Sequence, residues 1–176
     1  PFIAKAKMVL IFCADCRKWL SFYEEAGLTP RKPGAGDLLL AVEDAVIAAQ
    51  NAVMAAESLG IGSCYIGDVM ENAEEMKALL GLPQYVYPAC MLVFGYPVQQ
   101  QKERKKPERF AVSDIVCENC YQEKDSPRIR EMFSGKTGLQ EYDKWMEAFW
   151  KRKYESEFSN EMNRSMEVYL KDFCGD

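Results

Sequence analysis

The 176-residue sequence contains no histidine. Without an imidazole, these residues cannot form a Ser-His-Asp triad, a Cys-His catalytic pair or a metal site with histidine ligands. Any chemistry must therefore come from carboxylates, lysines, cysteines or a bound cofactor.

Long apolar runs and a secretory signal are also missing. No continuous run approaches the roughly 20 apolar residues that a membrane-spanning helix needs, and the first residues lack a small-residue cleavage site. Without such a signal, the seven cysteines, an odd number, favour a reducing compartment, so we predict a cytoplasmic protein. The sequence starts at Pro1 rather than Met and enters a strand-like run almost at once. We therefore expect the natural beginning of the chain to precede it.

The composition is that of an ordinary globular protein. Apolar residues make up 48% of the chain, and the 22 basic and 27 acidic residues leave a net charge of −5. This charge argues against a general affinity for nucleic acids. The length suits one domain with a substantial core.

Hydrophobic patterning predicts the order strand, helix, strand, helix, strand, strand and then helices. Residues 7–14 and 87–95 are continuous apolar runs, typical of strands buried on both faces. Residues 37–59 form the strongest predicted helix, whose many alanines would let another helix approach closely. The other predicted elements are a helix over 17–26, a loop over 29–36, a strand over 61–66, a helix over 73–80 with Asn72 as its cap, and a strand over 114–120.

From Ser126 onward the sequence becomes helical and amphipathic. Aromatic stripes in residues 140–154 and 158–173 need a covering surface, either the protein's own core or a partner subunit. Together the elements predict an α+β fold in layers, with a mixed sheet flanked by helices. We expect residues 1–125 to form the core, incomplete at its N-terminus, and residues 126–176 to be a C-terminal helical extension of the same domain.

One stretch, residues 42–67, carries an ordered set of motifs. In sequence order they are Asp44, Gln50-Asn51, Ala55-Ala56-Glu57, Gly60-Ile61-Gly62 and Ile66-Gly67. Gly-Leu-Pro follows at residues 81–83, Phe-Gly-Tyr-Pro at 94–97 and Lys-Pro-Glu-Arg-Phe at 106–110. In order and spacing this set resembles the nitroreductase family, and the resemblance extends over nearly all of residues 7–121.

The resemblance implies an FMN-binding homodimer that passes a hydride from NADH or NADPH, through flavin N5, to nitroaromatics, quinones or related acceptors. No catalytic side chain is implied, because the flavin carries the chemistry. By position, Cys64, Tyr65, Ile66 and Gly67 match the strand end that faces the flavin ring, and Lys106 and Arg109 match the basic residues that reach its phosphate. The family's arginine-rich N-terminal helix and its asparagine-bearing loop would precede Pro1.

Two alternatives stay open at this stage. The same scaffold serves other flavin reactions, such as dehalogenation, flavin destruction or flavin storage. The two C-x-x-C pairs, Cys13–Cys16 and Cys117–Cys120, are compatible with a zinc-stapled interaction module. Their separation exceeds the usual spacing of a zinc ribbon, so we interpret them as incidental thiols and assign no metal ligands. Cys64 beside the flavin is interpreted as a small apolar filler.

Overall fold

The computed structural model describes residues 3–137 and 141–174. It divides into two compact units, the first formed by Pro1–Gln99 and Glu157–Asp176 and the second by Gln100–Ser156. Each unit is described separately below.

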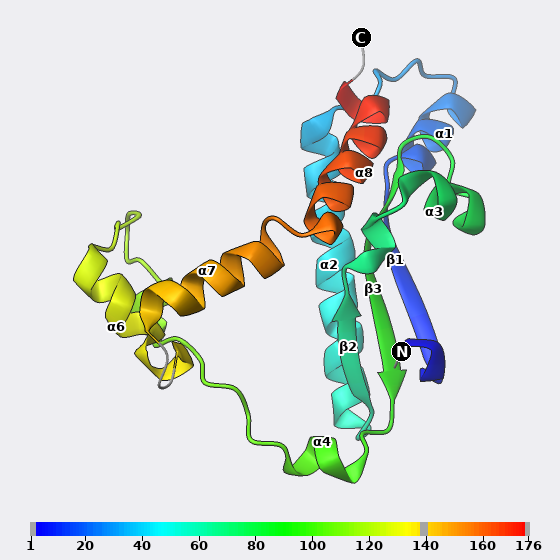
Figure 1. Cartoon of the computed structure of the whole chain (residues 1–176). Helices are drawn as coiled ribbons and strands as arrows, with labels where there is room; N and C mark the ends of the chain where they lie inside the picture. The colour runs from blue at the N-terminus through cyan, green and yellow to red at the C-terminus, as the bar shows by residue number, and fades with distance from the viewer. Residues whose placement is uncertain (1–2, 138–140, 175–176) are drawn as a thin grey trace. The chain divides into compact units, whose positions relative to one another are not determined.

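The first unit is built on a three-stranded sheet (Figure 1). After the short 3-10 helix η1 (Ile3–Lys5), the strands are β1 (Met8–Asp15), β2 (Gly62–Ile66) and β3 (Val86–Gly95), in the order β1-β3-β2. β1 and β2 both pair antiparallel with β3. The predicted α+β class is confirmed, and the described strand pairs are antiparallel where a mixed sheet was expected.

Burial differs sharply between the central and the edge strand. β3 is buried along nearly its whole length, and Leu92 has no exposed surface, as predicted. β1 begins exposed, with Met8 at 50% and Val9 at 44%. The prediction that this apolar run is buried on both faces is therefore wrong for its first half, because among the described strands β1 has only one neighbour.

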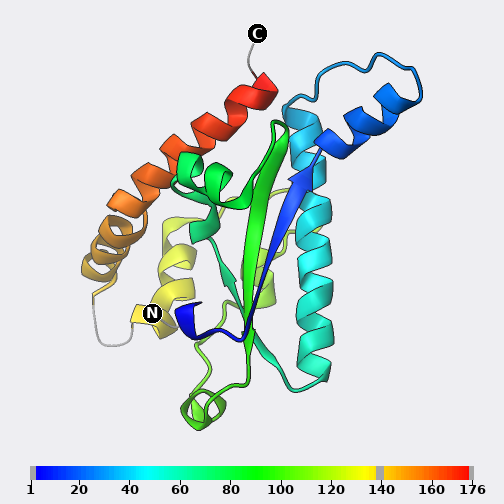
Figure 2. The same ribbon diagram turned by 90° about the vertical axis from the view of Figure 1, so that its right-hand side faces the viewer.

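The long helix α2 (Ala35–Ser58) confirms the helix predicted over residues 37–59. It runs along the sheet (Figure 2). Its Ala49 and Ala56 form one buried cluster with Cys90, Leu92 and Phe94 of β3. The small side chains therefore admit the sheet at this point rather than a second helix.

The opposite side of α2 is apolar and exposed. Leu39 is 63% exposed, Ile47 61% and Met54 58%. An 18-residue window of the helix has a mean hydropathy of 1.5, so α2 is long and apolar enough to cross a membrane by length and composition. The sequence has no continuous apolar run of this length, and α2 meets the averaged criterion because its few charged residues are spread along the helix. A core helix also passes this test, although only 11% of the window is buried here.

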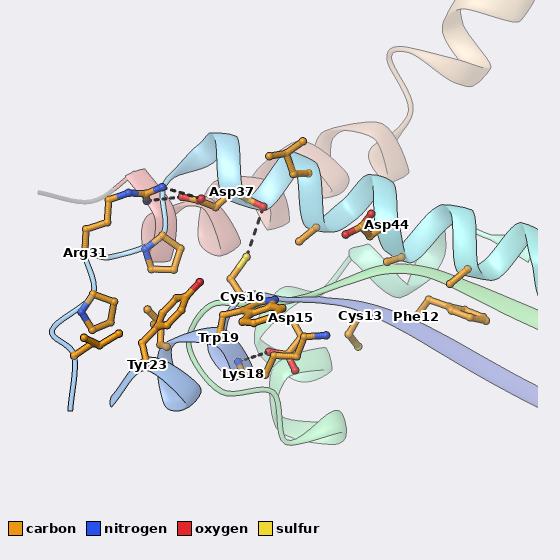
Figure 3. A pocket seen from close by; sticks show the side chains of 18 of the residues that line it. Phe12, Cys13, Asp15, Cys16, Lys18, Trp19, Tyr23, Arg31, Asp37 and Asp44 are labelled. Atoms are coloured by element: carbon orange, nitrogen blue, oxygen red, sulfur yellow. Dashed lines mark hydrogen bonds and ion pairs between the residues drawn. The ribbon is translucent and has the colours of Figure 1, made fainter. Parts of the chain in front are cut away.

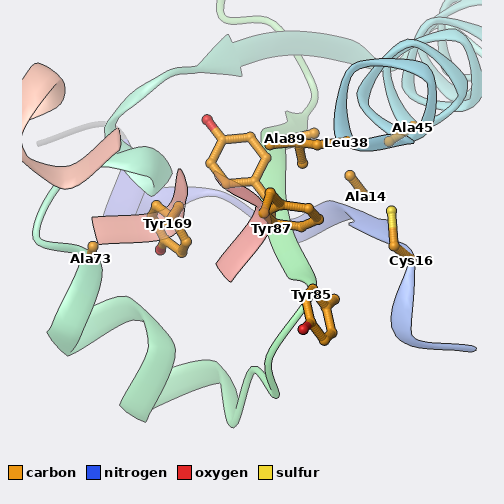
Figure 4. Packing of buried hydrophobic residues seen from close by; sticks show 10 residues of the cluster. Ala14, Cys16, Leu38, Ala45, Ala73, Tyr85, Tyr87, Ala89 and Tyr169 are labelled. Atoms are coloured by element: carbon orange, nitrogen blue, oxygen red, sulfur yellow. The ribbon is translucent and has the colours of Figure 1, made fainter. Parts of the chain in front are cut away.

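A second cluster joins the sheet to the C-terminal helix α8 (Glu157–Cys174), which was predicted over residues 158–173 (Figure 4). The rings of Tyr87 and Tyr169 pack edge to face, with their centroids 5.0 Å apart. The rings of Tyr85 and Phe173 also pack edge to face, with their centroids 5.7 Å apart. The protein's own core thus covers the aromatic stripe of α8.

Helix α3 (Ala73–Leu80) forms as predicted and follows the 3-10 helix η2 (Asp68–Met70). Its predicted cap is wrong, because the Asn72 side chain makes no capping hydrogen bond. Instead, α8 supplies the acceptors: the Asn72 N–H donates to Glu161 Oε1 and the Ala73 N–H donates to Ser165 Oγ, each at 3.0 Å. Side chains distant in sequence therefore satisfy the free N–H groups of this helix end.

The second unit is helical. It contains most of α4 (Gln99–Glu103), then α5 (Val112–Ile115), α6 (Ser126–Thr137) and α7 (Tyr142–Lys153). α7 confirms the helix predicted over residues 140–154, of which residue 140 lies outside the described part. The strand predicted over residues 114–120 is wrong. Asp114 belongs to a short helix and is buried in an ion pair with Arg128, and Asn119 has a positive φ of 63°, which interrupts extended structure.

Candidate functional site

Four of the predicted cofactor-binding residues lie at the end of β2: Cys64, Tyr65 and Ile66 are its last three residues, and Gly67 follows it. Tyr65 lies on the α2 side of the sheet, where its hydroxyl donates to Gln50 Oε1 at 3.3 Å. Burial, together with the nearby Cys90, raises the pKa of Tyr65, so its hydroxyl is neutral at pH 7. Because side chains alternate along a strand, Cys64 and Ile66 share the other face. Cys64 is exposed there, and Ile66 is buried.

Gly67 follows this strand and precedes η2. Its φ of −82° and ψ of −20° are right-handed values that any residue can adopt. A Cβ atom built on it would meet, among the described residues, only the Met70 Cε atom, at a comfortable 3.8 Å. Neither backbone strain nor internal packing therefore requires glycine here. The bare backbone is open to close approach by another group.

The two basic residues predicted to bind phosphate, Lys106 and Arg109, lie in the second unit and are exposed. Arg109 lines a cavity of about 300 Å³ together with Arg128 and Lys136. The other two cations are engaged: Arg128 pairs with Asp114 and Glu131, and Lys136 donates to the Glu108 carbonyl at 3.0 Å.

Among the described residues, no hydrogen bond or ion pair engages the Arg109 guanidinium, which leaves it available to an anion. Gly67 belongs to the first unit, so a site shared by the glycine and these cations stays a prediction.

The motifs gave no indication of a cavity of about 840 Å³ in the first unit (Figure 3). It lies between the C-terminal end of β1, helix α1 (Arg17–Glu25), the following loop and the first half of α2. Trp19 and Tyr23 of α1 line this cavity with stacked rings whose centroids are 6.1 Å apart. Asp44 of α2 lines it as well. The signal in the sequence was the i, i+4 pair of aromatics Trp19 and Tyr23, just before the proline-containing loop predicted over residues 29–36.

One ion pair organises the rim of this cavity. The Arg31 guanidinium donates to both carboxylate oxygens of Asp37, at 2.6 and 2.9 Å, and the Gly34 N–H donates to the same carboxylate at 2.8 Å. These bonds, led by that from Arg31, lower the pKa of Asp37 to about 2. The pair connects the loop to the first turn of α2, where the helix dipole also stabilises the negative charge of the carboxylate.

The cysteines make no metal cluster in the described residues, where no group of three or more potential ligands converges. Cys13 and Cys16 line the large cavity of the first unit, whereas Cys117 and Cys120 lie in the second unit. The zinc-stapled alternative gains no support from this arrangement.

Comparisons with known proteins agree with the motifs. The chain is 31% identical over 160 residues to a Cr(VI) reductase from a Pseudomonas species, an overlap of 91% of this chain and 61% of that protein. It is 39% identical over 123 residues to an oxygen-insensitive NADPH nitroreductase from Salmonella typhimurium, covering 70% of this chain and 48% of the relative. The chain thus spans roughly half to three-fifths of the length of these relatives.

Solved structures share the fold. Nitroreductase A from Vibrio parahaemolyticus superposes with a TM-score of 0.72 at 27% identity, over 97% of this chain and 69% of that one. An NADPH:FMN oxidoreductase from Vibrio harveyi, solved in complex with NAD+, superposes with a TM-score of 0.68 at 26% identity, over 94% of this chain and 67% of its own. The sequence model of the nitroreductase family matches residues 1–96, which include the whole three-stranded sheet and the open backbone at Gly67. The chain therefore belongs to the nitroreductase family.

Proposed function

We propose that the protein is an FMN-dependent oxidoreductase that passes a hydride from NADH or NADPH, through flavin N5, to nitroaromatic, quinone or similar acceptors. The observation that carries this proposal is the family match over the segment containing β2 and Gly67. The names of the Salmonella nitroreductase and the Vibrio harveyi oxidoreductase support NADPH and FMN as the reactants.

The residues present fit an FMN. The open backbone at Gly67 suits a planar ring, which would lie against residues 64–67. The free guanidinium of Arg109 suits a phosphate, which it can bind through two parallel hydrogen bonds, and Lys106 would add a second positive charge. When bound, the flavin supplies the atom that accepts and donates the hydride.

The chain's own contribution is positioning. The hydrogen bond from Tyr65 to Gln50 fixes the end of β2 against α2, which holds the backbone at Gly67 in one place. A main-chain N–H of residues 64–67 would then donate to the ring near N5 and favour its electron-rich reduced form. No side chain is assigned a proton-transfer role.

The proposal includes a cytoplasmic homodimer with the cofactor at the interface. The exposed apolar side of α2 supports a second copy as the covering partner, because a contiguous apolar surface of this kind marks an interaction site. Analytical ultracentrifugation tests this directly, and we expect a dimer that Ile47→Glu converts to monomer. A wild-type monomer, or a protein that partitions into membranes, would contradict it.

The decisive experiment is flavin uptake. We expect purified protein to bind FMN, to show the yellow absorbance of an oxidised flavin and to bleach when NADH or NADPH is added without oxygen. Gly67→Val should lose FMN and keep the melting temperature of the flavin-free protein, since the φ and the space at this position accept a side chain. The exposed Glu75→Gln serves as the control that keeps the flavin. Equal retention in both variants would remove Gly67 from the site, and a colourless wild type that takes up no FMN would refute the function.

The phosphate assignment has its own test. Arg109→Gln should weaken FMN binding by roughly tenfold or more, and Arg109→Lys should recover part of the loss, because a charge remains without the two-pronged geometry. Arg104→Gln, an exposed change in the same basic segment, is the matched control. A comparable loss from Arg104→Gln would point to general charge attraction instead.

A further inference from the structure

The two C-x-x-C pairs share one spacing and have opposite backbone geometries. Cys13 lies within β1, and Cys16 follows the last residue of that strand. Three residues of extended strand span about 10 Å, and a disulfide needs Cα atoms within about 7 Å. The first pair is therefore held open by its strand.

The surroundings of the first pair also make its thiols unreactive. Cys16 is 8% exposed and its sulfur donates to the Asp37 carbonyl at 3.7 Å. Burial, with Asp15 as a nearby negative charge, raises the pKa of Cys13, and burial does the same for Cys16. Few thiolates therefore form at this pair, and thiolate is the form that reacts.

The second pair lies on a tight reversal of the chain. The Cys120 N–H donates to the Glu118 carbonyl at 2.8 Å, a bond that spans only two residues, and Asn119 between them has a φ of 63°. This is the geometry of a γ-turn. The Cys117 sulfur donates to the Gln122 carbonyl at 4.0 Å, so the chain leaving the turn passes back beside Cys117. The chain therefore reverses between the two cysteines instead of holding them apart along a strand.

The two cysteines of this loop differ in exposure. Cys120 is exposed and Cys117 is half-buried. This arrangement suits a stepwise reaction in which the exposed thiol meets a reagent and the sheltered thiol, held in the same loop, completes the exchange.

We propose that Cys117 and Cys120 form a redox-active dithiol that a small-molecule disulfide, such as oxidised glutathione, converts into a disulfide within the loop. The Cys120 thiolate attacks one sulfur of the reagent, which breaks its S–S bond and releases the first glutathione thiolate. The Cys117 thiolate then attacks the Cys120 sulfur and expels the second. The protein loses two electrons and two protons, and the reagent gains them as two molecules of glutathione. This inference is independent of the flavin proposal.

Trypsin separates the two pairs and provides an internal comparison. Cleavage after Lys7 and Arg17 releases residues 8–17 with the first pair, and cleavage after Arg109 and Lys124 releases residues 110–124 with the second. The reduced protein is incubated with oxidised glutathione, blocked with N-ethylmaleimide in denaturant, digested and analysed by mass spectrometry. We expect residues 110–124 to be lighter by two hydrogen atoms and free of maleimide, and residues 8–17 to carry two maleimides. The second pair should close at least about tenfold faster than the first, because Cys120 is exposed to the reagent and the first pair is held open by its strand.

Single substitutions test the order of the two attacks. Cys117→Ser should trap glutathione on Cys120, since no second thiol can displace it. Cys120→Ser should take up less glutathione, because the remaining Cys117 is half-buried. The proposal is overturned if wild-type residues 110–124 keep two maleimides, if both cysteines retain glutathione, or if residues 8–17 close as fast.

Discussion

The two compact units of the chain are stabilised by different interactions. In the first unit, apolar side chains on both sides of the sheet are removed from water, among them Ala49, Leu92 and Tyr169 with 1% exposure or less. In the described part of Gln100–Ser156, the only buried residue is Asp114. The second unit is stabilised by a series of contacts between aromatic rings. The ring centroids are 5.1 Å apart for Phe110 and Phe133, 5.6 Å for Phe133 and Trp145, and 5.1 Å for Trp145 and Phe149.

This difference has a consequence for stability. Burial stabilises a fold in proportion to the apolar area removed from water, and regions with little buried area open locally at low cost in free energy. We therefore expect the sheet unit to dominate global stability and the helical unit to open first. The predicted phosphate ligands Lys106 and Arg109 belong to the unit that opens more easily.

The largest expected effect comes from the centre of the sheet. Leu92→Ala should lower the free energy of unfolding by about 2–5 kcal/mol, because Leu92 is fully buried and the substitution leaves a cavity. Leu79 of α3 is 76% exposed, so Leu79→Ala is the matched control. It should change the free energy of unfolding by about 0.5 kcal/mol or less. Urea denaturation followed by circular dichroism measures both. Equal costs would abolish the proposed contrast between core and surface.

An intermediate effect is expected within the second unit. Arg128→Ala removes the guanidinium from the buried Asp114 carboxylate, which should cost about 1–3 kcal/mol locally. Hydrogen exchange should become faster in residues 110–136 and stay unchanged in β3. The control is Arg130→Ala, whose ion pair with Asp143 is exposed on both sides and contributes about 0–1 kcal/mol. Faster exchange throughout β3 in Arg128→Ala would mean that the two units unfold together.

The smallest effect is electrostatic and depends on pH. Arg164 donates to Glu74 and Glu161 at 2.8–2.9 Å. Its hydrogen bonds lower the pKa of each carboxylate from 4.5 to about 2. At neutral pH both carboxylates are ionised whether the chain is folded or unfolded, so the stabilisation is fully present. It is lost as the pH falls from about 4.5 toward 2, where the unfolded state takes up protons first.

Melting temperatures test this linkage. The melting temperature of the wild type should be slightly higher than that of Arg164→Gln at pH 7. The difference should shrink as the pH falls from about 4.5 toward 2. Lys144→Gln, which disrupts an exposed i, i+3 pair in the other unit, should show a smaller difference. A margin for Arg164→Gln that is independent of pH would assign the role of Arg164 to packing.

Local patterns predicted the regular elements well where one physical signal dominated. The apolar period of residues 37–59 predicted α2, and the continuous apolar run of residues 87–95 predicted β3. The predicted strand over 114–120 failed because its apolar residues gave no sign that Asp114 would pair with Arg128. The Asn72 cap failed because Asn72 adopts a left-handed conformation without a capping bond, and acceptors on α8 bind the N–H groups of Asn72 and Ala73 instead. In the candidate site, the motifs identified Gly67 and Arg109 as candidates but did not predict the large cavity at the end of β1.

The sequence by itself determined the α+β class, most of the helices and strands, and the resemblance that led to the family, because these depend on periodicity and motif order along the chain. Only the tertiary structure decided which apolar surface is buried, that Gly67 is free of strain and internal contacts, and that two C-x-x-C pairs of equal spacing differ in geometry. The buried surface depends on neighbours distant in sequence, with β3 and α8 forming the core. The surroundings of Gly67 and the strand and γ-turn at the cysteines depend on local backbone conformations that the residue pattern does not specify.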